Sequence, residues 1–140
     1  MRPVCISLLL LSFSASVWAL PEEAQVIDRT LTVCLDRSDS DRKRLDCLDE
    51  ARDDWEELVE ELSEDVDDAL LKQRLHDQQR WHLRLDAQWQ SYRTTTLTGI
   101  AQACGQRCLR NQLETDLELL RQRAQQLAAE LAALVPASAR

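Results

Sequence analysis

Glycine and proline are nearly missing from this 140-residue chain, which contains 2 glycines and 3 prolines. The prolines stand at positions 3, 21 and 136, so none interrupts residues 22–135. Runs of β-branched residues are also absent, apart from the three threonines at 94–96. Leucine, alanine, glutamate, glutamine and arginine are abundant, and they are strong helix formers. The chain from residue 20 onward is therefore predicted to be almost entirely helical.

The motifs of familiar enzymes and metal sites are absent as well. The sequence contains no phosphate-binding loop, no HExxH zinc motif and no nucleophile elbow. His76 and His82 are six residues apart, which would place them on different faces of a helix. We therefore expect no catalytic residue, no bound metal and no cofactor, and we expect that the protein is not an enzyme.

Positive charge is also scarce, because 17 basic residues stand against 25 acidic ones and the net charge is −8. Nucleic acid is excluded as a partner, since phosphate binding needs a basic face. Between residues 49 and 68 there are 12 acidic residues and a single basic one, Arg52. This run is either a solvated helix face or a docking surface for a cationic protein. The candidate partner-binding residues are Asp53, Asp54, Glu57, Glu60, Glu61 and Glu64.

The first 19 residues have the features of a secretory signal peptide. Arg2 precedes an apolar run, and small residues end at Ala19. The apolar run is shorter than the roughly 20 residues that span a bilayer. We therefore expect cleavage after Ala19, a periplasmic or secreted protein, and no stable membrane anchor after cleavage. Residues 20–140 are of the size of one domain.

Four cysteines would remain after Cys5 is removed with the signal peptide: Cys34, Cys47, Cys104 and Cys108. An even number in an exported chain predicts two disulfides, and three pairings are open. Since Cys34 and Cys47 flank a turn and the other two are one helical turn apart, we expect two bridges between the first hairpin and the last helix. Cys34–Cys108 with Cys47–Cys104 is preferred over the opposite cross-pairing.

Apolar spacing predicts about four helices, and hence an all-α fold: a small antiparallel bundle stapled by two disulfides. The first helix should begin after Pro21 and end at a turn over residues 38–41. A weak break is expected at 63–68, and a connection at 94–99, where threonines and a glycine disfavour helix. A heptad of leucines from Leu113 runs to about residue 135. That stripe either packs inside the domain or pairs with another helix, as in a homodimer or an assembly module.

The segment from Trp81 to Cys108 carries three of the four aromatic residues that follow position 19, and it is expected to organise the packing. Trp89 and Tyr92 lie one helical turn apart, and Arg93 is placed to reach a carboxylate. The interpretation that we favour is an aromatic core layer with one buried ion pair. The candidate core residues are Trp55, Trp81, Trp89, Tyr92 and Arg93.

This pattern of a cysteine pair, an acidic helix, Trp-x-x-Tyr-Arg and two later cysteines resembles the lysozyme inhibitor LprI-like family, over about residues 30–125. The matching positions are Cys34, Cys47, Asp54, Leu58, Leu62, Leu75, Trp89, Tyr92, Arg93, Cys104 and Cys108. One departure is that residues 94–97 stand where the family typically has a cysteine. The resemblance implies an envelope-associated binding protein, in some members an inhibitor of lysozyme.

Overall fold

The computed structural model describes residues 20–135, nearly all of which are helical. The elements are, in chain order, α1 (Glu22–Arg37), α2 (Asp41–Lys72), α3 (His76–Cys104), the 3-10 helix η1 (Gly105–Cys108) and α4 (Leu109–Leu134). No strand occurs within residues 20–135. The prediction of an all-helical protein is therefore confirmed. The expected signal peptide, residues 1–19, lies outside the described residues.

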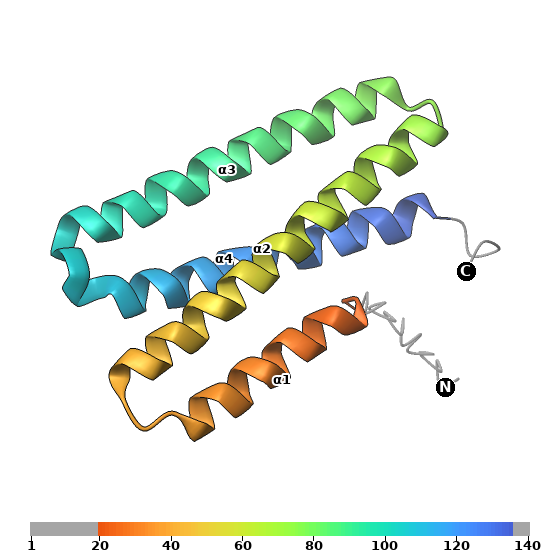
Figure 1. Ribbon diagram of the computed structural model, residues 1–140. Helices are drawn as coiled ribbons and strands as arrows, with labels where there is room; N and C mark the ends of the chain where they lie inside the picture. The colour runs from red at the N-terminus through yellow and green to blue at the C-terminus, as the bar shows by residue number, and fades with distance from the viewer. Residues whose placement is uncertain (1–19, 136–140) are drawn as a thin grey trace, which may run out of the picture.

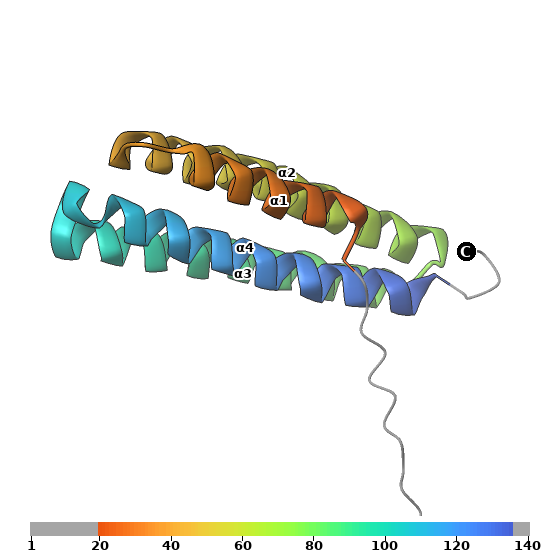
Figure 2. The same cartoon turned by 90° about the horizontal axis from the view of Figure 1, so that it is seen from below.

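The helices form two layers. Figure 2 shows α1 and α2 together in one layer, and α3 and α4 in the other. The turn between α1 and α2 and the turn between α3 and α4 lie at the same end of the molecule (Figure 1). α2 crosses α4 and packs against it more extensively than any other two helices pack. The α2–α4 contact is therefore the main packing interface of the bundle.

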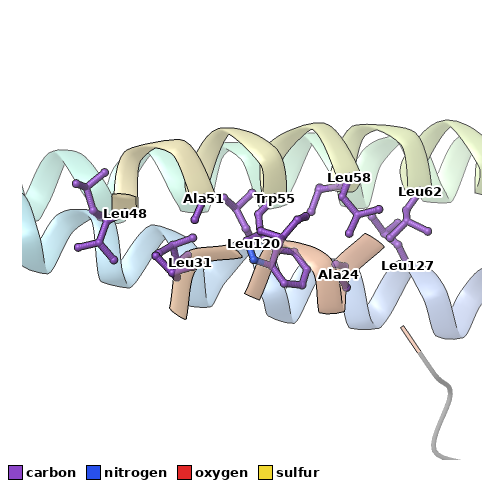
Figure 3. Packing of buried hydrophobic residues seen from close by; sticks show 14 of the residues in the cluster. Ala24, Leu31, Leu48, Ala51, Trp55, Leu58, Leu62, Leu120 and Leu127 are labelled. Atoms are coloured by element: carbon purple, nitrogen blue, oxygen red, sulfur yellow. The ribbon is translucent and has the colours of Figure 1, made fainter. Parts of the chain in front are cut away.

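The core is an apolar seam between α2 and α4 that α1 covers on one side (Figure 3). Trp55 is completely buried at its centre, with Leu120 and Leu127 of α4. Apolar side chains recur along α2 at steps of three and four, which places them on one helix face. The buried apolar residues of α2 are Cys47, Leu48, Ala51, Trp55, Leu58, Val59, Leu62, Val66 and Leu70.

The leucine stripe of α4 belongs to this core. Leu113, Leu117, Leu120 and Leu127 are all buried within the domain. An assembly module that paired through the same stripe would have to expose it and give up the packing against α2.

The turn expected at residues 38–41 is present. The Ser38 hydroxyl donates a hydrogen bond to the Cys34 carbonyl at 2.7 Å, and so satisfies one of the last carbonyls of α1. The Ser40 hydroxyl accepts from the Lys43 backbone N–H at 3.3 Å and caps the start of α2.

Two of the expected helix boundaries are wrong. α2 continues through residues 63–68, because Val66 is 1% exposed and is held in the seam with α4. α3 continues through residues 94–99, where the Thr96 hydroxyl donates to the Tyr92 carbonyl at 2.9 Å. Intrinsic propensities differ by less than about 1 kcal/mol per residue, which is too little to break either helix.

Two disulfides are present, but the expected cross-pairing is wrong. Cys34 is bonded to Cys47 and Cys104 to Cys108, with Cα atoms 5.8 Å and 5.6 Å apart. Both separations lie within the range that a disulfide requires. Each bridge closes a turn between consecutive helices. Each cysteine is therefore paired with one that is near in sequence and not with one in the other layer of helices.

The segment from residue 81 to 108 does not organise the core. Trp81 and Tyr92 each have 59% of their surface exposed, and Trp89 is only partly buried. The buried residues of α3 are His82 and Arg93. The physical reason is that α3 turns a polar face inward. It contacts the other helices through Gln79–Asp67, His82–Ser63, Asp86–Arg123, Arg93–Glu56 and Arg93–Asp116.

This difference between two tryptophans is open to a direct test. Trp55→Ala should lower the free energy of unfolding by about 3–5 kcal/mol, because it empties a fully buried site. Trp81→Ala, a matched change at an exposed site, should alter it by no more than about 0.5 kcal/mol. Urea unfolding followed by far-UV circular dichroism measures both values. Equal losses in the two variants would contradict the assignment of the core.

Candidate functional site

A groove of about 400 Å³ lies between the start of α1 and the middle of α2. Its apolar lining is Val26 and Ile27 of α1 and Leu58 of α2. Five carboxylates surround these apolar side chains. They belong to Glu22, Glu23, Asp54, Glu57 and Glu61.

The helical repeat explains how α2 supplies its side of the groove. Residues 54, 57, 58 and 61 are separated by three and four positions, so their side chains lie along one helix face. On α1, Glu22 and Glu23 stand in the first turn, where the helix dipole stabilises negative charge. The loop at residues 38–40 folds α1 back along α2 and brings the two sets together (Figure 1).

None of the five groove carboxylates forms an ion pair with a side chain in the described part of the chain. All five residues are exposed. Carboxylates of like charge that share a groove repel one another, and a cation between them removes that repulsion. The groove is therefore an unneutralised negative site with an apolar lining.

The structure brings together half of the six acidic residues that the sequence singled out. Asp54, Glu57 and Glu61 line the groove. Asp53, Glu60 and Glu64 are also exposed on α2, but they do not line it. Asp53 instead accepts a hydrogen bond from Arg52 at 2.7 Å.

Sequence reasoning missed Glu22 and Glu23, which are 31–39 residues from their α2 neighbours in the groove. The available signal was a pair of acids directly after Pro21, followed by the apolar pair Val26 and Ile27. Those residues identify a helix start with an apolar face, but not the helix that packs beside it.

The position of α1 is fixed by a polar contact among three helices. The Trp55 indole N–H donates to Asp28 Oδ1 at 3.3 Å, and Arg121 Nη2 of α4 donates to the same oxygen at 2.7 Å. The Arg121 guanidinium also lies over the Trp55 ring, 5.7 Å from its centroid. Together with the Cys34–Cys47 bridge, this contact holds the α1 wall of the groove against α2.

The carboxylate that Arg93 reaches is Asp116 of α4. The two side chains form a bidentate pair, with Nε–Oδ1 at 2.6 Å and Nη2–Oδ2 at 2.8 Å. Arg93 Nη1 also donates to Glu56 of α2 at 2.7 Å. The Trp89 ring contacts two guanidinium groups, that of Arg93 on the same helix, α3, and that of Arg123 on α4. This cluster joins α2, α3 and α4, and it is structural.

His82 is the one histidine that is buried among residues 20–135. His82 Nε2 lies 3.1 Å from the Ser63 carbonyl, and Nδ1 lies 3.6 Å from Glu130. Within residues 20–135, no group of three or more histidines, cysteines and acids is placed to hold a metal ion. None of the helices described is both long and apolar enough to cross a membrane.

The sequence matches no protein-family model, no curated protein and no solved structure. The resemblance to the LprI-like family is therefore supported by the residues named above alone.

Arg93 allows a test of the buried pair. Arg93→Met should lower the free energy of unfolding by about 3–5 kcal/mol, because Asp116 is left buried without its partner. Adding Asp116→Leu to that variant should restore much of the loss, since an apolar pair needs no counter-charge. Urea unfolding of the single and double variants gives both values. A double variant no more stable than Arg93→Met would contradict this explanation.

Glu56 predicts a dependence of stability on pH. The hydrogen bond from Arg93 lowers the pKa of Glu56 below its ordinary value of 4.5. Its stabilising contribution is therefore present above pH 4.5 and is lost as the pH falls through the lowered pKa of the folded state. As the pH is lowered through that range, the free energy of unfolding of Glu56→Gln should fall less steeply than that of the wild-type protein. In a protein that already carries Arg93→Met, the same substitution should leave the slope unchanged.

Proposed function

We propose that this protein is an exported, non-enzymatic binding protein that captures a cationic protein in the groove between α1 and α2. The observation that supports it is the set of five unpaired carboxylates around an apolar lining. A lysine or arginine side chain matches both features. Its charged head would meet the carboxylates, and its methylene stem would lie on Val26, Ile27 and Leu58.

A strongly basic protein such as lysozyme is the partner that we favour, in the periplasm or outside the cell. The net charge of −8 would steer such a partner toward the protein, and the groove would hold one of its basic side chains. The resemblance to the LprI-like family supports the same partner. Inhibition would then follow if the bound protein covers the approach to the enzyme's substrate cleft.

The arrangement of the helices is part of this proposal. We take the domain to be an antiparallel bundle of four helices in which α1 and α2 act as the binding hairpin. In that arrangement α3 and α4 support the hairpin from the opposite layer (Figure 2). The apolar stripe of α4 would then serve the bundle itself rather than a second copy.

Two triple variants that remove the same charge separate recognition by the groove from attraction by the net charge. Asp54→Asn, Glu57→Gln and Glu61→Gln together should weaken lysozyme binding at least about tenfold, because they remove the α2 carboxylates of the groove. Asp53→Asn, Glu60→Gln and Glu64→Gln together should weaken it less than about threefold, since they change only the surrounding field. Isothermal titration calorimetry and a lysis assay, with protein that starts at residue 20, measure both effects.

Raised salt should weaken binding of the wild-type protein, because exposed charges are screened. If the two triple variants lost equal amounts of lysozyme affinity, the attraction would come from the net charge and not from the groove. Absence of binding and of inhibition at micromolar protein, in low as well as high salt, would remove lysozyme as the partner.

A further inference from the structure

The two disulfides constrain different amounts of structure. Cys34–Cys47 joins α1 to α2 with a sequence separation of 13, and Cys47 is buried in the core. Cys104–Cys108 has a sequence separation of only 4 and spans η1, which already closes the turn between α3 and α4. The first bridge therefore links two long helices, whereas the second closes only the single turn of η1.

We propose that Cys104–Cys108 is a redox-active disulfide that exchanges electrons with thiols of a partner molecule. The proposal does not depend on the acidic groove, which is lined by the start of α1 and the middle of α2. The turn between α3 and α4 lies instead at the end of the molecule where α1 ends (Figure 1). Its three supports are the position of the two cysteines at helix ends, the charges around them and their access to solvent.

The two sulfur atoms stand at opposite kinds of helix end. Cys104 is the last residue of α3, and Cys108 immediately precedes Leu109, the first residue of α4. A helix N-terminus stabilises a thiolate, whereas a helix C-terminus destabilises it. After the bridge opens, Cys108 is therefore the sulfur that better holds a negative charge.

The charges at this turn favour the same sulfur. Arg107 and Arg110 flank Cys108, and the first turn of α4 has no acidic residue. Across from them, Asp41 and Arg44 of α2 line a hollow of about 210 Å³ that also touches both arginines. Glu114 is paired with Arg110 at 2.9 Å. Arg44 in turn lies 3.8 Å from Asp41, so within the described residues Arg107 is the arginine of this turn that forms no ion pair.

Access completes the argument. Gln106 and Arg107, between the two cysteines, are exposed, and both cysteines are partly exposed. The Cβ position of Gly105, whose φ is +54°, meets no neighbouring atom within 4 Å, so the turn is open at this residue. A partner's thiolate would approach the partly exposed cysteines at this turn.

The exchange uses a dithiol as the partner. One thiolate of the dithiol attacks Cys104 Sγ, the bond between the two cysteine sulfurs breaks, and Cys108 leaves as the stabilised thiolate. The second thiolate of the partner then attacks the mixed disulfide and releases Cys104. Two electrons pass to the protein and the partner becomes a disulfide. Of the two protons lost by the partner's thiols, one is taken up by Cys104 and the other goes to solvent for as long as Cys108 stays a thiolate.

Titration of the full chain with dithiothreitol, followed by mass spectrometry after alkylation, tests the difference between the bridges. Cys104–Cys108 should be half-reduced at a dithiothreitol concentration at least about tenfold below that for Cys34–Cys47. The far-UV circular dichroism spectrum should stay unchanged through the first step. Reduction of both bridges together, or of Cys34–Cys47 first, would overturn the proposal.

Two single variants compare the sulfur atoms directly. At neutral pH, Cys108 in Cys104→Ser should react with iodoacetamide about tenfold faster than Cys104 in Cys108→Ser. Adding Arg107→Gln should slow Cys108, whereas Arg84→Gln, on an exposed part of α3 far from the turn, should not. Cys108 reacting no faster than Cys104 would overturn the proposal. If either variant fails to fold, the titration of the wild-type protein still decides the question.

Discussion

Burial of Trp55 between α2 and α4 is the interaction on which the rest of the structure depends. Its ring is completely buried among leucines of both helices (Figure 3). The indole N–H, the one polar group of this side chain, donates to Asp28 of α1. One side chain therefore anchors the seam between the layers and also positions the helix that covers it. Because the α1 wall of the acidic groove follows from that position, the groove depends on the core directly beneath it.

α3 is held by a different kind of interaction. Its inner face offers Gln79, His82, Asp86 and Arg93 to polar partners on α2 and α4, while Trp81 and Tyr92 face solvent. Buried polar contacts depend on accurate geometry, since an unpaired buried charge is costly. Apolar packing thus binds α1, α2 and α4 into one unit, and a row of polar contacts fixes how α3 lies on it.

The sequence predicts some of these features and not others, for identifiable reasons. The scarcity of glycine and proline predicts the helical class, and Pro21 with the serines at 38 and 40 predicts both ends of α1. Three of the five groove carboxylates follow from the acidic run on α2, but the two on α1 depend on a tertiary contact that no local pattern encodes. The disulfide pairing was missed because cysteine spacing leaves the connectivity open. The inward polar face of α3 was missed because aromatic residues such as Trp81 and Tyr92 are usually buried.

The most direct test of the central claim, that the groove between α1 and α2 binds cationic side chains, is NMR mapping with a short lysine- and arginine-rich peptide. Amide resonances of the first turn of α1 and of residues 54–61 of α2 should shift together and saturate with one affinity. The amides of α3 should stay unchanged. Shifts spread evenly along the acidic face of α2, or centred on α3, would contradict the account.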